Sequence, residues 1–218
     1  LIEGSLANPA DVRRALDGVT GVLHQGALPS VPKSIDRPLE TNQANVVGTL
    51  TLLQMCRELD IQRVVYAASS SAYGDHDAQI KSESLEPRPK SPYAVQKLTG
   101  EYYCSVYSEL FGMRTVALRY FNVFGPRQNP ESQYAAVVPA FITRMLRGES
   151  PIIYGDGLQS RDFTFIENVI SANLLALEAP AEYCGRVYNV GCGSKATLLD
   201  LVDGINDILG TGIRPVFE

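Results

Sequence analysis

Short apolar runs alternate with longer amphipathic stretches along most of the chain, and this alternation predicts an α/β fold. Strands are predicted at 19–24, 63–68 and 115–120, where apolar and β-branched residues are concentrated. Helical periodicity occupies about 39–59 and 91–111 between them. Because strand–helix–strand units join parallel strands, we expect a Rossmann-like, doubly wound parallel sheet with helices on both faces.

Residues that begin or interrupt helices sharpen these boundaries. Asn8 can cap a helix whose first position is Pro9, and a serine–proline pair repeats the signal at 91–92. Pro29 and Pro32 predict a loop after the first strand.

The pattern changes after Gly125, where a loop rich in proline, asparagine and serine is followed by shorter elements. The predicted elements are helices at 137–146, 167–177 and 198–209 and strands at 152–154 and 187–190. We therefore expect a second, smaller α/β lobe that interleaves with the main sheet.

Composition narrows the classes of function. The net charge of −5 argues against a surface that tracks nucleic acid, although a few placed cations could hold a small anion. No apolar run is long enough to span a bilayer, and the first residues show no signal-peptide pattern, so we expect a cytoplasmic protein without a membrane partner. The four cysteines and two histidines lack metal-ligand spacing, which predicts reduced thiols and no metal site. The strand-like runs at 1–4 and 215–218 predict a fragment of a longer enzyme.

Tyr93 and Lys97 lie four residues apart in the predicted helix at 91–111, so they share one face near its amino-terminal end. A nearby ammonium and a helix amino terminus both favour a phenolate, which predicts that the pKa of Tyr93 is lowered toward neutrality. Such a phenolate could remove a proton from a substrate hydroxyl. Tyrosine and lysine at this spacing are common, however, and the pair alone favours a surface tyrosine beside a solvated lysine.

A run of serines changes that preference. Residues 69–71 are all serine; they follow the predicted strand at 63–68 and precede Tyr73 and Gly74. Small hydroxylated residues at the carboxyl end of a parallel strand lie where such sheets bind ligands. A hydroxyl there can stabilise charge that develops on a substrate oxygen. A polar loop is the ordinary explanation of a serine run, but the direct junction with an apolar strand favours a site.

Four motifs occur in the order and spacing of one known family. They are SSSAYGD at 69–75, SPYAVQK at 91–97, LRYFNVFGP at 118–126, and GDG followed by SRDF within 155–163. Together they resemble the extended short-chain dehydrogenase/reductase family, in its branch of NAD-dependent nucleotide-sugar epimerases and dehydratases. The resemblance covers essentially the whole chain. It implies that Ser69 supplies the catalytic hydroxyl, Tyr93 the base and Lys97 its partner, with NAD as the cofactor.

The same resemblance assigns domains and contact residues. It implies a partial NAD-binding Rossmann domain at 1–124, to which 163–192 returns, and a partial substrate-binding lobe at 125–162 and 193–218. The positions that would contact NAD are Ser5, Leu6, Gln25, Gly26, Ala27, Asn45, Ala67, Tyr93, Lys97, Tyr120 and Val123. Those that would contact the substrate are Ser30, Ser70, Ser71, Asn122, Ala136, Val137, Tyr154 and Arg161.

Two of these positions have competing interpretations, and a third departs from the family pattern. Arg161 matches an arginine that grips a diphosphate, a task suited to its forked donors; the alternative is a surface arginine paired with Asp162. Asn45 matches a helix asparagine near the cofactor, but a buried asparagine satisfied by backbone fits nearly as well. Ser5 stands where the family often has an aspartate that contacts adenine.

The glycine-rich turn that holds a dinucleotide pyrophosphate, G-x-x-G-x-x-G, does not occur in these residues. The acidic residue for the adenosine ribose, about 20 residues later, is also missing. We expect the parent enzyme to possess both, and the fragment alone to hold its cofactor poorly.

The residues after the catalytic hydroxyl discriminate between reactions of this branch. The 4,6-dehydratases carry an Asp-Glu pair there and glucuronate decarboxylases usually a nearby glutamate, whereas this chain has Ser70 and Ser71. The resemblance therefore implies reversible oxidation at C4, with Tyr93 taking the hydroxyl proton and NAD the hydride, and return of hydride to the other face of the 4-keto sugar. The segments 24–34 and 134–139 are most similar to 4-epimerases of UDP-N-acetylated sugars.

Two alternatives remain open, namely another enzyme of the branch, such as a 4-reductase or 4,6-dehydratase, and a non-catalytic NAD-binding relative. The intact Ser69, Tyr93 and Lys97 argue against the second. Family dimers pair through two helices of each copy, so we also expect a homodimer. An apolar stripe for it could come from Tyr102, Val106 and Leu110, although core packing would explain the same stripe.

Overall fold

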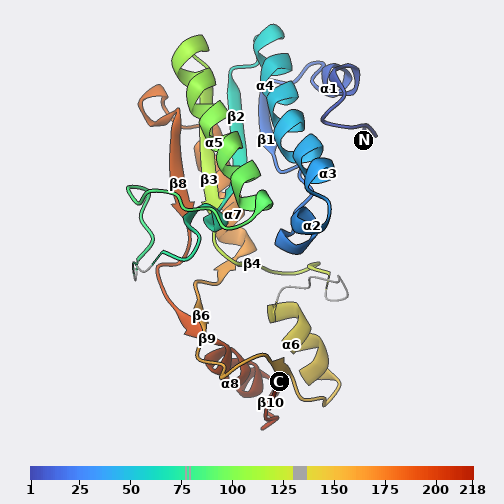
Figure 1. The fold of residues 1–218 in the computed structure, drawn as a ribbon, viewed down its shortest axis with the longest axis vertical. Coiled ribbons are helices and arrows are strands. Elements are labelled where there is room, and N and C mark those ends of the chain that lie inside the picture. The colour runs from blue at the N-terminus through green and yellow to red at the C-terminus, as the bar shows by residue number, and fades with distance from the viewer. Residues whose placement is uncertain (77, 79, 130–136) are drawn as a thin grey trace. The chain divides into compact units, whose positions relative to one another are not determined.

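The computed structural model describes residues 1–76, 78, 80–129 and 137–218 (Figure 1). The chain forms two compact units. Unit 1 comprises Leu1–Tyr120 and Ile170–Val190, and unit 2 comprises Phe121–Val169 and Gly191–Glu218. The chain thus enters unit 2 twice, and the domain assignment made from the family resemblance stays a prediction.

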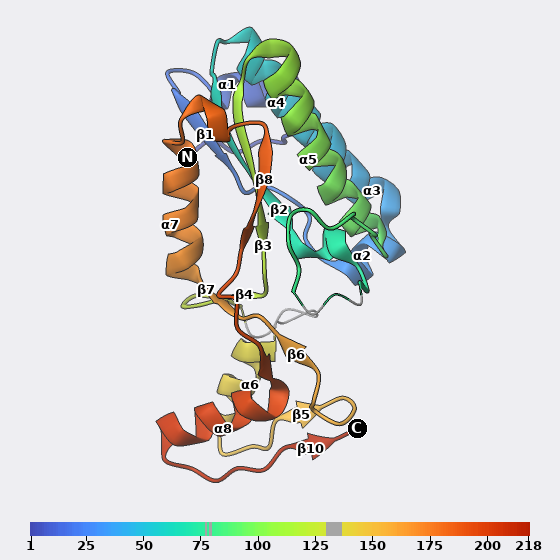
Figure 2. The ribbon, with the colours of Figure 1, turned by 90° about the vertical axis from the view of Figure 1, so that its left-hand side faces the viewer.

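Unit 1 is built on a four-stranded parallel sheet in the order β1-β2-β3-β8 (Figure 2). The strands are β1 (Gly21–His24), β2 (Arg63–Ser69), β3 (Arg114–Tyr120) and β8 (Arg186–Val190). The central strands are almost wholly inaccessible; Val64, Val65 and Val116, for example, are all buried. Burial on both faces is characteristic of parallel sheets, and it confirms the predicted Rossmann-like α/β class.

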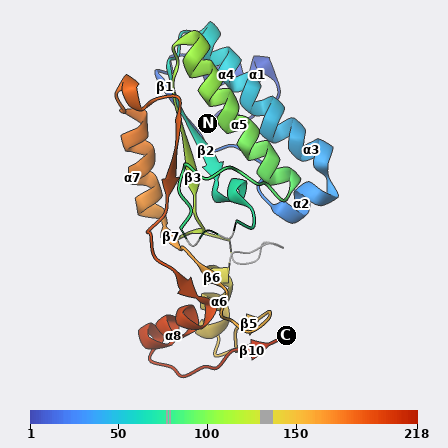
Figure 3. The same cartoon turned by 60° about the vertical axis from the view of Figure 1, so that its left-hand side comes forward.

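Helices cover both faces of this sheet. The helices α4 (Gly48–Glu58) and α5 (Pro92–Phe111) lie side by side on one face, and α7 (Ile166–Leu177) lies on the other (Figure 3). The short helix α1 (Pro9–Ala15) packs against α4. The predicted caps are confirmed, because the side chains of Asn8 and Ser91 accept hydrogen bonds from the first turns of α1 and α5.

In the region after β1 the predicted loop was wrong in detail, and the predicted helical stretch at 39–59 is confirmed as a continuous run of three helical segments. The predicted loop contains α2 (Val31–Asp36), capped by Ser30, because a proline in the first helical turn needs no N–H partner there. The predicted helix at 39–59 consists of α3 (Pro38–Asn42), the π-helix η1 (Gln43–Val47) and α4. Residues 1–4, predicted as the end of a strand, belong to no strand.

The helix α5 approaches strand β2 very closely at Gly100. A Cβ atom at this position would lie 2.3 Å from the Tyr66 hydroxyl, which is itself buried in the core of unit 1. Glycine is therefore required by the approach of α5 to the sheet. The Tyr66 hydroxyl donates a hydrogen bond to the Lys97 carbonyl on the same helix at 3.4 Å.

Unit 2 packs two helices on short strand pairs. Its helices are α6 (Val137–Leu146) and α8 (Leu198–Leu209), and their buried residues include Phe141, Met145, Val202 and Ile205. Its two-residue strands are β4 (Val123–Phe124), β5 (Ile152–Ile153), β6 (Ser160–Arg161), β7 (Thr164–Phe165), β9 (Ala196–Thr197) and β10 (Val216–Phe217). They pair as β4 with β7, β5 with β10, and β6 with β9. Two 3₁₀ turns, η2 (Ser70–Tyr73) and η3 (Ala181–Tyr183), belong to unit 1.

Within the described residues, no helix combines the length and the apolar character that crossing a membrane requires. Nor does this part of the chain hold three or more His, Cys, Asp or Glu side chains arranged to bind a metal ion. The four cysteines are free thiols, and Cys56 and Cys104 are buried.

Candidate active site

The carboxyl edge of the parallel sheet brings predicted site residues of unit 1 together. Strand β2 ends at Ser69, which is in register with Tyr120 at the end of β3. Helix α5 begins beside them, with Tyr93 in its first turn and Lys97 one turn later. The first turn is fixed from outside the helix, because the backbone N–H of Tyr93 donates to the Oγ of the fully buried Ser34 at 3.0 Å.

The Ser69 hydroxyl is oriented by its neighbour. Its oxygen accepts one hydrogen bond from the Ser71 hydroxyl at 2.8 Å and another from the Ser71 backbone N–H at 3.2 Å. These bonds use the acceptor capacity of the oxygen, so its own hydrogen is directed elsewhere. A hydrogen bond from Ser69 acts on Tyr93 and lowers the pKa of the phenol. The structure therefore places these two side chains in contact.

The electrostatics of Tyr93 differ from the prediction. Burial raises the pKa of its phenol above the ordinary value and outweighs the opposing effect of the Ser69 hydrogen bond. The expected lowering by Lys97 was wrong for this structure, because the lysine ammonium is anchored on the sheet. In the protein by itself Tyr93 is thus a neutral phenol at physiological pH.

Lys97 is a buried cation, with 3 % of its surface exposed. Its Nζ donates to the carbonyl of Ala67 in β2 at 2.8 Å and lies 5.0 Å from the centre of the Tyr66 ring. Burial lowers the pKa of the ammonium to about 8, and the negative charge of Glu101 acts in the opposite direction. This is not the solvated surface lysine that the Tyr93–Lys97 pair alone would have favoured.

A buried ion pair that the sequence analysis missed lies behind Lys97. Arg119 donates to the carboxylate of Glu101 through two nitrogens, at 2.9 and 2.6 Å, and both side chains are at most 4 % exposed. The guanidinium carbon also lies 4.5 Å from the centre of the Tyr73 ring. The available signal was position, since Glu101 follows Lys97 by four residues and so continues the face that carries Tyr93.

The segment after β1, where the family resemblance places NAD, is fixed by two polar clusters. In the first, Gln25 donates to the Tyr120 hydroxyl at 3.1 Å and to the amide oxygen of Asn173 on α7 at 2.9 Å. Asn173 donates in turn to the Tyr120 hydroxyl at 2.8 Å. The cluster joins the ends of β1 and β3 to α7.

Asn45 forms the second cluster. It is 2 % exposed; its amide oxygen accepts from the Leu28 N–H at 2.7 Å, and its nitrogen donates to the Leu28 carbonyl at 3.1 Å. This is the arrangement of a buried asparagine satisfied largely by backbone. A direct contact between Asn45 and NAD stays a prediction.

The remaining predicted cofactor positions of unit 1 lie along the same region. The Leu6 side chain packs against Gly26, where a Cβ would come within 2.6 Å of Leu6 Cδ1. Ser5 does not carry a carboxylate, but its backbone N–H donates to the carboxylate of Asp11 at 3.1 Å. Ala27 is half-buried.

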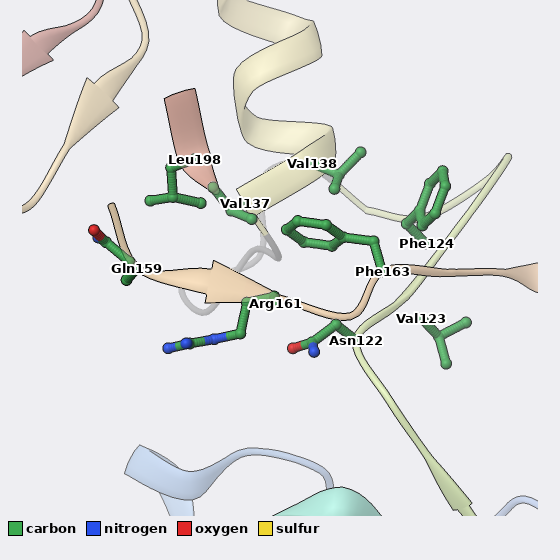
Figure 4. Close-up of a pocket in the computed structure, with 9 residues that line it drawn as sticks. All are labelled: Asn122, Val123, Phe124, Val137, Val138, Gln159, Arg161, Phe163 and Leu198. Atoms are coloured by element: carbon green, nitrogen blue, oxygen red, sulfur yellow. The ribbon is translucent and has the colours of Figure 1, made fainter. Parts of the chain in front are cut away.

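Unit 2 contains a pocket of about 260 Å³ (Figure 4). Its lining residues are Asn122, Val123, Phe124, Val137, Val138, Gln159, Arg161, Phe163 and Leu198. Figure 4 shows the apolar side chains of Val137, Val138 and Phe163 gathered together, with Arg161 and Asn122 near one edge. An apolar wall beside a cation and an amide suits a ligand with a flat ring and a negative charge.

Arg161 is not paired with its neighbour Asp162. The Asp162 carboxylate instead accepts hydrogen bonds from the backbone N–H groups of Cys192 and Gly193, both at 2.9 Å. The Arg161 guanidinium is exposed, and its Nη1 donates to the Ser160 carbonyl. The alternative of an Arg161–Asp162 surface ion pair was therefore wrong.

The other predicted substrate residues are more scattered. Tyr154 is 71 % exposed and is not among the residues lining the unit 2 pocket. Ser30 adopts a φ of 136°, an uncommon backbone conformation for a residue other than glycine, where it caps α2. Ser70 begins the 3₁₀ turn η2. Ala136 lies outside the described residues. Gln159, Phe163 and Leu198 were not predicted, because their positions depend on the fold of unit 2.

Comparison with known proteins assigns the family. Residues 1–191 match the model described as the NAD dependent epimerase/dehydratase family. The chain belongs to this family. It is 39 % identical over 198 residues to a putative UDP-glucose 4-epimerase of Methanocaldococcus jannaschii, and the match covers 90 % of this chain and 63 % of that protein. The chain thus spans a little under two thirds of this curated relative.

Two similar solved structures are enzymes that catalyse different reactions, an epimerase and a dehydratase. One is UDP-N-acetylglucosamine 4-epimerase from Methanobrevibacter ruminantium M1 in complex with UDP-N-acetylmuramic acid, with a TM-score of 0.94 and 42 % identity; the match covers 100 % of this chain and 69 % of that one. The other is the dTDP-glucose 4,6-dehydratase DesIV from Streptomyces venezuelae, with NAD bound, with a TM-score of 0.83 and 29 % identity. That match covers 99 % of this chain and 66 % of the dehydratase chain.

Proposed function

We propose that the intact enzyme catalyses NAD-dependent epimerisation at C4 of a UDP-sugar, through a transient 4-keto sugar. The observation that carries this proposal is the joint placement of Ser69, Tyr93 and Lys97 at the carboxyl edge of the parallel sheet, in a chain of the epimerase/dehydratase family. The NAD contacts predicted from the sequence belong to this proposal as well.

The hydrogen-bonding capacity of Lys97 fits the binding of NAD. The buried Lys97 ammonium has three donor hydrogens, and among the described residues the Ala67 carbonyl is its one hydrogen-bond acceptor. A buried cation with free donors suits ribose hydroxyls. NAD, when bound, supplies the acceptor that takes hydride from C4 and gives it back.

The chain's own groups then handle the proton and the oxygen. In this proposal the Tyr93 phenol first releases its own proton to solvent. Its phenolate Oη then takes the proton of the C4 hydroxyl as the C4–H bond breaks, and it returns this proton to the oxygen when hydride comes back to the opposite face. The Ser69 hydroxyl, held by Ser71, donates to the sugar oxygen or to Tyr93 as charge develops. No net oxidation results.

The unit 2 pocket fits the nucleotide part of such a substrate. Its apolar wall can hold a pyrimidine ring, and Arg161 offers forked donors to a diphosphate. Asn122 and Val137 line the same pocket. Substrate contacts by Ser30, Ser70, Ser71, Ala136 and Tyr154 stay predictions of the family resemblance.

An N-acetylated UDP-hexose, such as UDP-GlcNAc, is the substrate that we favour. The relative at 42 % identity is a UDP-N-acetylglucosamine 4-epimerase. A 4,6-dehydratase is the second candidate, since a dehydratase is among the similar structures. Elimination needs an added acid and base after the catalytic hydroxyl, and Ser70 and Ser71 provide neither.

NMR of UDP-GlcNAc incubated with the intact enzyme and NAD tests the proposal. We expect the C4 epimer to appear, and the reaction to stop in a Tyr93→Phe variant. A 6-deoxy-4-keto product would contradict epimerisation, and unchanged turnover by Tyr93→Phe would contradict the assignment of the base. We further propose that the enzyme works in the cytoplasm as a homodimer.

A further inference from the structure

A buried chain of amide groups crosses from helix α5 to the segment after β1. It starts at Gln96, which is 3 % exposed and lies between Tyr93 and Lys97 in the sequence. The Gln96 Oε1 accepts a hydrogen bond from Asn45 Nδ2 at 2.8 Å, and its Nε2 donates to Thr41 Oγ1 at 3.0 Å. Both partners are buried as well.

Asn45 continues the chain to the backbone. Its Oδ1 accepts from the Leu28 N–H, and its Nδ2 also donates to the Leu28 carbonyl, so both backbone groups of Leu28 are bonded to Asn45. Asn45 belongs to the π-helix η1, and single π turns inside helices are frequent at functional sites. One side chain of α5 is thereby connected, through one asparagine, to the segment 25–28.

We propose that Gln96 is a positioning residue, which holds the segment 25–28 at a fixed separation from Tyr93 and Lys97. The inference rests on the proposed function, in which this segment runs beside NAD. Gln96 contacts neither cofactor nor substrate in this proposal and acts through Asn45.

The two hydrogen bonds at residue 96 require an amide side chain. Gln96 accepts from Asn45 and donates to Thr41, and a glutamine side chain can do both. Methionine has a similar length but offers neither group, so it would leave the Asn45 donor without its acceptor. A buried donor without an acceptor loosens the structure around it.

A matched pair of variants in the intact enzyme tests the proposal. Gln96→Met removes the bridge from α5 to Asn45. Gln54→Met is the control, because Gln54 on α4 also makes a side-chain hydrogen bond with α5, accepting from the Tyr107 hydroxyl at 3.1 Å, but has no bond to the segment 25–28 among the described residues. The readouts, all taken without substrate, are the NAD dissociation constant, the melting temperature and amide hydrogen exchange in a peptide that covers 25–30.

We expect Gln96→Met to raise the NAD dissociation constant by about tenfold and to speed exchange in 25–30, with a melting temperature close to that of Gln54→Met. In an Asn45→Leu background, Gln96→Met should cause no further change in the NAD dissociation constant or in the exchange rate of 25–30. Unchanged exchange in 25–30, or an NAD affinity equal to that of Gln54→Met, would overturn the inference. A wild type that binds NAD but yields no epimer would count against the proposed reaction only.

Discussion

The Ser71 hydroxyl donates a hydrogen bond of 2.8 Å to the oxygen of Ser69, the residue that contacts Tyr93. This bond fixes the direction in which Ser69 presents its hydrogen. We expect Ser71→Ala to lower kcat by only about tenfold, because the Ser69 oxygen keeps one bond, from the Ser71 N–H. Ser71→Thr retains the hydroxyl and should restore most of the rate. Steady-state kinetics check both, and a Ser71→Ala enzyme as fast as the wild type would contradict this role.

Lys97 should cost stability while it serves catalysis. Its pKa in the folded protein is about 8 against an ordinary value of 10.5, so the unfolded state binds more protons between these values. The free energy of unfolding should therefore rise with pH in this window, and the cost of burial is fully present below pH 8.

A Lys97→Met variant isolates this effect. Its advantage in stability over the wild type should shrink by about 2–3 kcal/mol between pH 7 and pH 10, while its activity is lost at every pH. Urea unfolding at several pH values measures the difference. A constant difference would show that the lysine pKa is not lowered by burial.

His24 should make the fold sensitive to acid. It is 3 % exposed, and burial first, and the charge of Lys97 second, lower its pKa to about 3. The Thr49 hydroxyl donates to the Asn45 carbonyl at 2.6 Å, so it accepts from His24 Nε2 at 2.9 Å, and the ring is neutral.

Because the unfolded state protonates near pH 6.5, stability from His24 is present above that value and is lost as the pH falls. The loss should be about 3 kcal/mol between pH 7 and pH 4. His24→Gln should remove this pH-dependent loss of stability. His76→Gln, which changes the other histidine, should leave it unchanged. Circular dichroism follows the acid unfolding of both variants. If both lose stability equally as the pH falls, His24 is not the source of the acid sensitivity.

Arg161 should contribute to substrate binding rather than to the chemical step. Its guanidinium is exposed and is not paired with Asp162, so it is available to a diphosphate. We expect Arg161→Ala to weaken UDP binding by about 10–100-fold in calorimetry, and Arg161→Lys to recover part of the affinity without the forked donors. Arg147→Ala, at another exposed arginine of unit 2, should bind UDP normally. Undiminished UDP binding by Arg161→Ala would remove it from the site.

The apolar stripe on α5 supports the homodimer proposal. Tyr102, Val106 and Leu110 are 59, 43 and 67 % exposed, so packing within the chain does not account for them. Leu110→Glu should convert the intact enzyme to a monomer in sedimentation experiments, because a charge cannot be buried at an apolar interface without a partner. Leu146→Glu, at an equally exposed leucine of α6, should not. A wild-type monomer would end the proposal.

Much of the sheet could be predicted because its signals are local. Strand β2 and helix α5 follow from an apolar run and from the cap at Ser91, and the structure places them within a residue of the predicted bounds. The family resemblance named Ser69 and Tyr93 for one site, and in the structure a Ser69 hydrogen bond acts on Tyr93; their catalytic roles stay predictions. The two-residue strands of unit 2 were not predicted, because two residues carry no periodicity.

The features that were missed depend on distant parts of the chain. Glu101 and Arg119 are 18 residues apart and meet only because α5 packs on β3. The pKa of Tyr93 was predicted in the wrong direction, because the sequence shows its neighbours on the helix but not its burial. Ser34 could not be connected with Tyr93 before the fold was known.

Gly100 lies on α5 three residues after Lys97, and it sets the distance between this helix and strand β2. With no side chain there, the backbone of α5 lies against the Tyr66 hydroxyl, and Lys97 reaches the Ala67 carbonyl on the same strand. Even a methyl group at residue 100 would meet the Tyr66 side chain and push the helix outward, away from the carbonyl that Lys97 bonds. The site is therefore sensitive to substitution at a position that offers no functional group.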